Sequence, residues 1–191
     1  MSAMPVGSSD YPVRYTVDYA EGRDRLSVFF RIILVIPALI LSSGLSMATV
    51  PVALMLLFRR KYPHWWFEWN RELSRFSARV GTYAMLLRDE YPSTDEEQAV
   101  HLAIDEPDAT QLNRWLPLVK WLLALPHYIV LAVLWCALLL TTAIAWLIIL
   151  ITGKYPQGLF DFAVGVGRWT NRVMGYAFLL VTDRYPPFSL K

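Results

Sequence analysis

Two long apolar runs separated by polar segments dominate the pattern of this chain. The first run covers residues 32–58 and the second covers residues 115–151, where Lys120 is the only formal charge. A helix that crosses a membrane needs about 20 predominantly apolar residues. The two runs therefore predict membrane-inserted helices. Serine and glycine at 42–44 interrupt the first run and favour a turn there.

Two arrangements fit these runs. Either each run is a helical hairpin with both ends on one side of the membrane, or each is an interfacial helix followed by one long span. Arginine and lysine flank both ends of the first run, at residues 23–31 and 59–61. Because cytoplasmic loops are rich in Lys and Arg, we favour the hairpin and a multi-pass protein of the inner (plasma) membrane with cytoplasmic termini and strands. The arms of a hairpin in the first run would be short, so both arrangements stay open.

The same order of segments occurs twice along the chain. The matching pieces are residues 13–18 with 100–105, Pro37 with Pro126, Lys-Tyr-Pro at 61–63 with 154–156, and the closing Tyr-Pro at 91–92 with 185–186. So many matches in one order indicate a tandem repeat. We place its two copies at residues 11–92 and 98–188.

Each copy opens with an alternating apolar and polar segment that predicts a short β-strand. Because a lone strand leaves its edge unsatisfied, we expect the two strands to pair with each other or with a neighbouring chain. After the apolar run and the Lys-Tyr-Pro sequence, each copy has the pattern of an amphipathic helix suited to the membrane interface.

A charged stripe runs along one face of each amphipathic helix. It consists of Glu68, Glu72, Arg75 and Arg79 in the first copy and of Asp161, Gly165, Arg168 and Arg172 in the second. The simplest interpretation is a solvated face, with acidic residues before basic ones as the helix dipole prefers. The alternative is that the four arginines bind anionic lipid headgroups or the carboxylates of a partner.

Composition supports the membrane class. The chain of 191 residues is 55% hydrophobic and 18% charged, with a net charge of +2. These values exclude a disordered protein, and the balanced charge gives no reason to expect nucleic acid as a partner. The single cysteine, Cys136, excludes an intramolecular disulfide and a cysteine-based zinc cluster.

Catalytic motifs are missing from the sequence, and we expect no enzyme activity, no cofactor and no metal site. His127 follows Pro126 within an apolar run, and a polar residue at membrane depth is a functional candidate. Together with Pro37, these residues would mark a pathway or a break in a helix. We expect Arg31 and Lys120 to extend toward the membrane surface, with the lining of an ion path as the alternative.

Several motifs of the second copy resemble the bacterial DUF4389 family of membrane proteins. They are Leu-Pro-His at 125–127, Gly-Lys-Tyr-Pro at 153–156, Gly-Leu-Phe-Asp-Phe at 158–162 and Asp-Arg-Tyr-Pro-Pro-Phe at 183–188. The first copy is more divergent. Since the function of that family is unknown, the resemblance implies the membrane class and the repeat unit, and no catalytic residues.

We therefore expect a mostly α-helical integral membrane protein of two tandem repeats, each a short strand, a membrane hairpin and an interfacial amphipathic helix. The leading functional hypothesis is a non-enzymatic accessory or scaffold subunit of a membrane complex or homo-oligomer. Its partners would be membrane lipids and other membrane subunits or further copies of itself. The alternatives are a small channel or transporter with a site between the repeats, and a lipid-binding or membrane-shaping protein.

Overall fold

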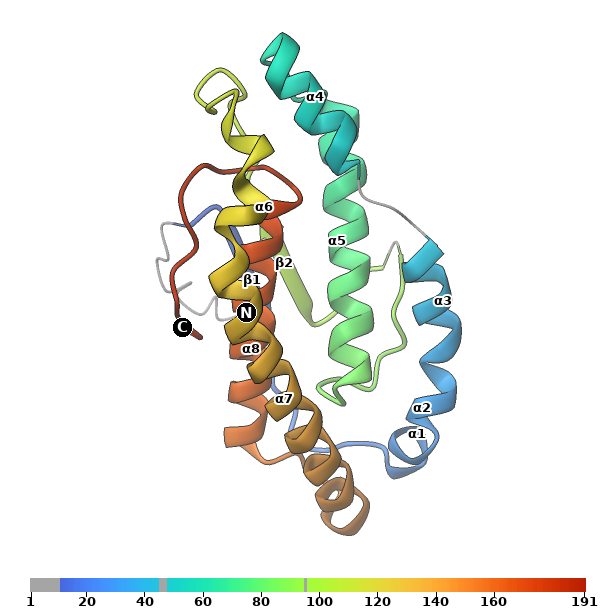
Figure 1. The fold of residues 1–191 in the computed structure, drawn as a ribbon. Helices are drawn as coiled ribbons and strands as arrows, with labels where there is room; N and C mark the ends of the chain where they lie inside the picture. The colour runs from blue at the N-terminus through green and yellow to red at the C-terminus, as the bar shows by residue number, and fades with distance from the viewer. Residues whose placement is uncertain (1–10, 45–47, 95) are drawn as a thin grey trace, which may run out of the picture.

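A computed structural model describes residues 11–44, 48–94 and 96–191 (Figure 1). The first repeat contains β1 (Val13–Val17), α1 (Arg25–Phe29), α2 (Arg31–Leu34), α3 (Ile36–Gly44), α4 (Thr49–Arg59) and α5 (His64–Ala84). The second contains β2 (Val100–Ile104), the 3-10 turn η1 (Leu116–Leu118), α6 (Lys120–Leu123), α7 (Leu125–Thr152) and α8 (Gln157–Ala177). The prediction of a mostly helical chain with one short strand per repeat is confirmed.

The two strands pair with each other as an antiparallel ribbon in which Tyr15 lies opposite Leu102. Their alternation follows the expected period of two, because every second residue of each strand is buried against the helices, apart from the half-buried Val17, while the residues between them lie on the outer face. On the outer face, Arg14 Nη2 contacts Asp105 Oδ1 at 2.6 Å across the ribbon. Of the two options for pairing, the structure therefore shows the intramolecular one.

The amphipathic helices are exchanged between the repeats. Helix α5 of the first repeat packs on β2 of the second, and α8 of the second packs on β1 of the first (Figure 1). The stripe arginines hold this exchange, since Arg75 Nε donates to the carbonyl of Leu102 at 3.1 Å and Arg168 Nε donates to that of Tyr15 at 3.2 Å. In space, the two sequence repeats therefore interlock instead of packing as two separate units.

The second apolar run forms one long helix, so the predicted hairpin is wrong there. Helix α7 has 28 residues and is the one helix of the described ranges that is long and apolar enough to cross a membrane. Pro126 lies in its first turn, where no helical hydrogen bond is lost, and no further proline or glycine interrupts the helix. The helix ends at Gly153, whose φ of 75° gives a left-handed cap.

The first apolar run is divided among shorter helices. Helix α3 packs along α5, whereas α4 packs against η1 near the opposite end of the molecule, and the two do not lie side by side (Figure 1). The arms of a hairpin are thus not formed, and with nine and eleven residues each helix is too short to span a bilayer. The predicted turn meets the end of α3 at Gly44, and residues 45–47 lie outside the described ranges. Within the described residues α7 is the one candidate span, so the predicted multi-pass topology is not supported.

Replacing Gly153 by alanine tests the left-handed cap of α7. A side chain disfavours this φ by about 1–2 kcal/mol, and the new Cβ would meet Arg25 Nε at 3.3 Å. We expect a loss of about 1 kcal/mol in the free energy of unfolding, seen as a lower Tm by circular dichroism in mild detergent. Gly158→Ala is the matched control, because its Cβ meets nothing within 4 Å. Equal melting of both variants would contradict the role of the cap.

Candidate functional site

Each repeat buries a cation near the start of its long apolar run. Arg31 in α2 is 2% exposed and Lys120 in α6 is fully buried. The expectation that these side chains extend toward the membrane surface is therefore wrong. A buried charge is costly unless it is paired and hydrogen-bonded, so the partners of the two cations show what the protein gains from them.

The two cations have equivalent partners. Arg31 forms an ion pair with Asp89, donates to the carbonyl of Arg88 at 2.9 Å, and lies 3.9 Å from the ring centre of Tyr83. Both cations meet three kinds of group: the carboxylate of an aspartate, the backbone carbonyl of the residue just before that aspartate, and the face of a tyrosine ring. We call these two sets of contacts the cation sites.

In the second cation site, Lys120 Nζ lies 2.8 Å from Asp183 Oδ1 and donates to the carbonyl of Thr182 at 2.8 Å. Its ammonium group is 5.3 Å from the ring centre of Tyr176. Burial lowers the pKa of Lys120, and the hydrogen bond and charge of Asp183 oppose that shift. The sequence signal that could have indicated these pairs is the aspartate shortly before the closing Tyr-Pro of each copy.

The four stripe arginines contact the protein itself. Besides the strand contacts of Arg75 and Arg168, Arg79 Nη1 donates to the carbonyl of Ser93 at 2.6 Å. Arg172 is only 3% exposed, and its Nη1 lies 3.5 Å from the carbonyl of Ser189. These contacts assign the arginines a role in joining helices, strands and loops, while binding of headgroups or a partner by them stays a prediction.

His127 lies in an aromatic cluster. Trp169 Nε1 donates to its Nδ1 at 3.0 Å, and its ring stacks on Phe188 with ring centres 4.0 Å apart. Pro126 and Pro37 occupy the exposed first turns of α7 and α3. The structure therefore does not bring the three predicted pathway residues together at one site.

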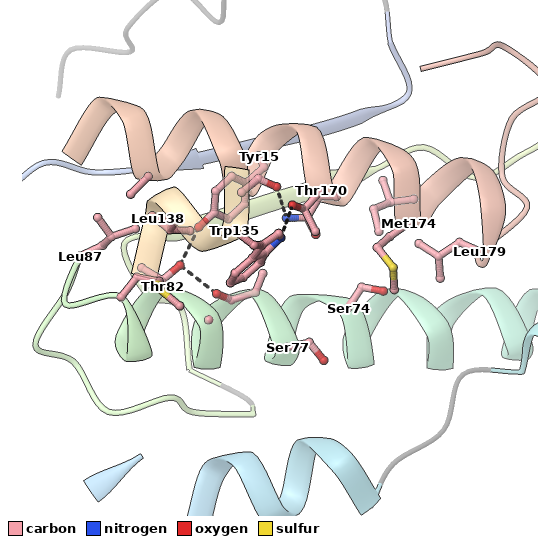
Figure 2. Close-up of a pocket in the computed structure, with 17 residues that line it drawn as sticks. Tyr15, Ser74, Ser77, Thr82, Leu87, Trp135, Leu138, Thr170, Met174 and Leu179 are labelled. Carbon is pink, nitrogen blue, oxygen red and sulfur yellow. Dashed lines mark hydrogen bonds between the residues drawn. The ribbon is translucent and has the colours of Figure 1, made fainter. Parts of the chain in front are cut away.

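A cavity of about 210 Å³ lies where the repeats meet, between α5 and α8 (Figure 2). Strand β1 and helix α7 contribute Tyr15, Trp135 and Leu138 to its wall. The lining contains no charged side chain. Its polar groups are satisfied locally, since the hydroxyls of Tyr15 and Thr82 share a hydrogen bond of 2.7 Å and Trp135 Nε1 donates to Thr170 Oγ1 at 3.3 Å.

The cavity exists because small residues face each other across the two helices. On α5 these include Ser74, Ala78 and Gly81, and on α8 Ala163 and Gly167. The sequence analysis missed the cavity, although the small residues on the inner faces of both helices were its visible signal.

A family model describes the chain. The model for DUF4389, a domain of unknown function, matches residues 25–94 and 115–189. The chain belongs to the DUF4389 family. The two matched segments agree with the two copies seen in the sequence. No curated protein and no solved structure matches the chain.

Removing the charge of Asp183 tests the second cation site of this DUF4389 protein. Asp183→Asn leaves the fully buried Lys120 without a counter-charge, and we expect a loss of at least about 2 kcal/mol, allowing for the partial exposure of the carboxylate. Adding Lys120→Met should recover most of that loss, because no unpaired charge then remains. Chemical unfolding of the four proteins of this double-mutant cycle measures the coupling. Purely additive losses would show that the pair is not coupled.

Two glycines of the cavity wall should respond in opposite ways to alanine. At Gly81 a new Cβ meets nothing within 4 Å, whereas at Gly167 it would lie 2.8 Å from Tyr15 Cε1. We expect Gly81→Ala to stabilise the protein by up to about 1 kcal/mol through helix propensity and Gly167→Ala to destabilise it. Thermal unfolding under identical conditions compares them. A fall in Tm for Gly81→Ala would show that there is no free space beside α5.

Proposed function

We propose that this protein is a non-enzymatic integral membrane protein that acts as an accessory or scaffold subunit of a membrane complex or homo-oligomer. The observation that carries the proposal is the apolar outer surface of α1–α4 and α7. Its most exposed large side chains are Leu26, Ile32, Ile33, Ile40, Val50 and Phe58 on α1–α4, and Ile129, Val133, Leu140 and Ile151 on α7. Monomeric soluble proteins rarely expose apolar surface on this scale, whereas lipid or a partner subunit would cover it.

Exposed tryptophans support a membrane boundary near one end of the molecule. Trp115 and Trp121 lie in the segment that leads into α7, and Trp65 lies in the first turn of α5. Helix α4, which precedes α5, packs against η1, so these segments are neighbours (Figure 1). Tryptophan is enriched at the level of the lipid headgroups.

The interior supports a structural role more than a catalytic one. The buried polar groups described above bind backbone carbonyls and each other. The two cation sites and the exchanged helices hold the two repeats together as a rigid frame. Within residues 11–44, 48–94 and 96–191, no group of His, Cys, Asp and Glu side chains is placed to hold a metal. A rigid frame with an apolar exterior suits a subunit that positions other membrane components.

The lipid-binding alternative is supported by one specific observation, the apolar cavity between the repeats. The same cavity gives little support to an ion channel, because no charged side chain lines it. For a channel, we would expect polar or charged groups along a continuous path.

The test combines membrane integration with the state of assembly. We expect the protein to resist alkaline carbonate extraction and, in mild detergent, to migrate as an oligomer or with a second protein that crosslinking retains. Ile144→Lys places a charge on the exposed face of α7, which disfavours insertion by about 2.5–3.5 kcal/mol, so the membrane-bound fraction should fall.

Thr94→Lys is the control, because it adds the same charge to an exposed position of the linker between the repeats. We expect this variant to fractionate like the wild type. Release by carbonate would contradict the membrane proposal. A lone monomer in mild detergent that crosslinks to nothing would contradict the scaffold proposal.

A further inference from the structure

We propose that the cavity between α5 and α8 holds one acyl chain of a phospholipid drawn from the surrounding bilayer. This inference rests on the membrane insertion proposed above and names the site and the ligand class. Four observations support it: a groove that adjoins the cavity, an uncharged lining, an unpartnered hydroxyl near the groove, and the position of the groove on the candidate membrane helix.

A groove between α7 and α8 adjoins the cavity. It has a volume of about 450 Å³ and includes Tyr128, Leu131, Val173 and Phe178 in its lining. Trp135, Thr170 and Met174 line both the groove and the cavity, so these side chains separate the two spaces. Figure 2 shows the three residues at the wall of the cavity. For an acyl chain to pass from the groove into the cavity, these three side chains must move aside.

The chemistry of both spaces fits a hydrocarbon. Neither lining contains a charged side chain, and Thr170 and Asn171 donate to the helix carbonyls of Val166 and Gly167, each at 2.8 Å. A polar solute would find few free groups there, whereas an acyl chain needs none. An engineered apolar cavity of about 150 Å³ already binds benzene, so the larger cavity between α5 and α8 has room for a segment of such a chain.

The hydroxyl of Tyr128 favours a phospholipid over a plain hydrocarbon. Its oxygen is buried and has no hydrogen-bond partner. Tyr128 lies in the first turns of α7, the end that follows the exposed Trp115 and Trp121. If these tryptophans lie at the headgroup level, the hydroxyl lies close to the depth of the ester groups and can donate to an ester carbonyl.

The groove opens along α7, whose exposed residues are almost entirely apolar. When α7 spans the bilayer, the groove meets hydrocarbon rather than water. The lipid that surrounds the helix is then the nearest source of a chain. An acyl chain of a bilayer phospholipid is therefore the occupant to which the structure points.

The experiment uses the full-length protein in vesicles that contain phosphatidylglycerol with a photoreactive diazirine near the end of one acyl chain. After irradiation, peptide mapping locates the label. We expect label on the cavity face of α5, at Ser74 and Ala78, and on the exposed face of α7. A Cβ at Gly81 meets nothing within 4 Å, so Gly81→Met places its side chain in the cavity. We expect it to reduce the α5 label about tenfold, which corresponds to a loss of about 1.4 kcal/mol in binding. Label on α7 should not change.

Gly158→Met is the matched control, because it adds the same side chain at an exposed position of α8 away from the cavity. Ala78→Leu fills the cavity from the neighbouring turn of α5 and replaces Gly81→Met if circular dichroism shows that Gly81→Met is misfolded. Tyr128→Phe should also lower the α5 label, since it removes only the hydroxyl.

The outcomes separate this inference from the proposed function. Strong label on α7 with none on α5, or α5 label that survives both filling variants, overturns the acyl-chain site while leaving membrane insertion intact. Absence of label from both helices overturns membrane insertion as well. Loss of the α5 label in the filling variants, with normal labelling in Gly158→Met, supports the site.

Discussion

The pairing of one buried cation with one aspartate in each repeat is the constraint on which the rest of the structure depends. Arg31 and Lys120 come from the start of a repeat and Asp89 and Asp183 from its end, so each pair closes its repeat. A buried charge that loses its partner costs several kcal/mol, so the segment that ends the repeat cannot move away. The turns just before these aspartates contain Leu86 and Leu180, both with positive φ.

These turns also connect one repeat with the other. Tyr62 donates to the carbonyl of Leu179 at 2.8 Å, and Tyr155 lies 3.4 Å from that of Met85, so a tyrosine of each repeat contacts the turn of its counterpart. Burial raises the pKa of both tyrosines to about 12, which keeps the hydroxyls protonated as donors. The packing of α5 on β2 and of α8 on β1 likewise joins each repeat to the other. Each repeat is therefore closed by its own cation and completed by contacts with the other.

The sequence predicted the elements better than their packing. Local pattern placed the two strands and the two amphipathic helices, because their periodicity and the Lys-Tyr-Pro sequence act over a few residues. The apolar runs were ambiguous, since a continuous run has no period that separates a hairpin from one long helix; α7 is unbroken because nothing after Pro126 interrupts it. The cation sites join residues far apart in the chain, and the cavity arises from side chains that are small, so neither was visible as a motif.

The antiparallel ribbon, formed by one strand from each repeat, has a consequence for the origin of the molecule. A single repeat by itself would have an unpaired strand and an amphipathic helix without the strand that it covers, and two identical chains could satisfy both needs by exchanging these parts. The protein thus has the design of a dimer joined into one chain. When the two repeats are joined in one chain, their sequences can differ. The second repeat has the unbroken helix α7 where the first has α3 and α4, and Met174 occupies the position that corresponds to Gly81. Two joined repeats can therefore form an asymmetric interior, which two identical subunits related by symmetry cannot form.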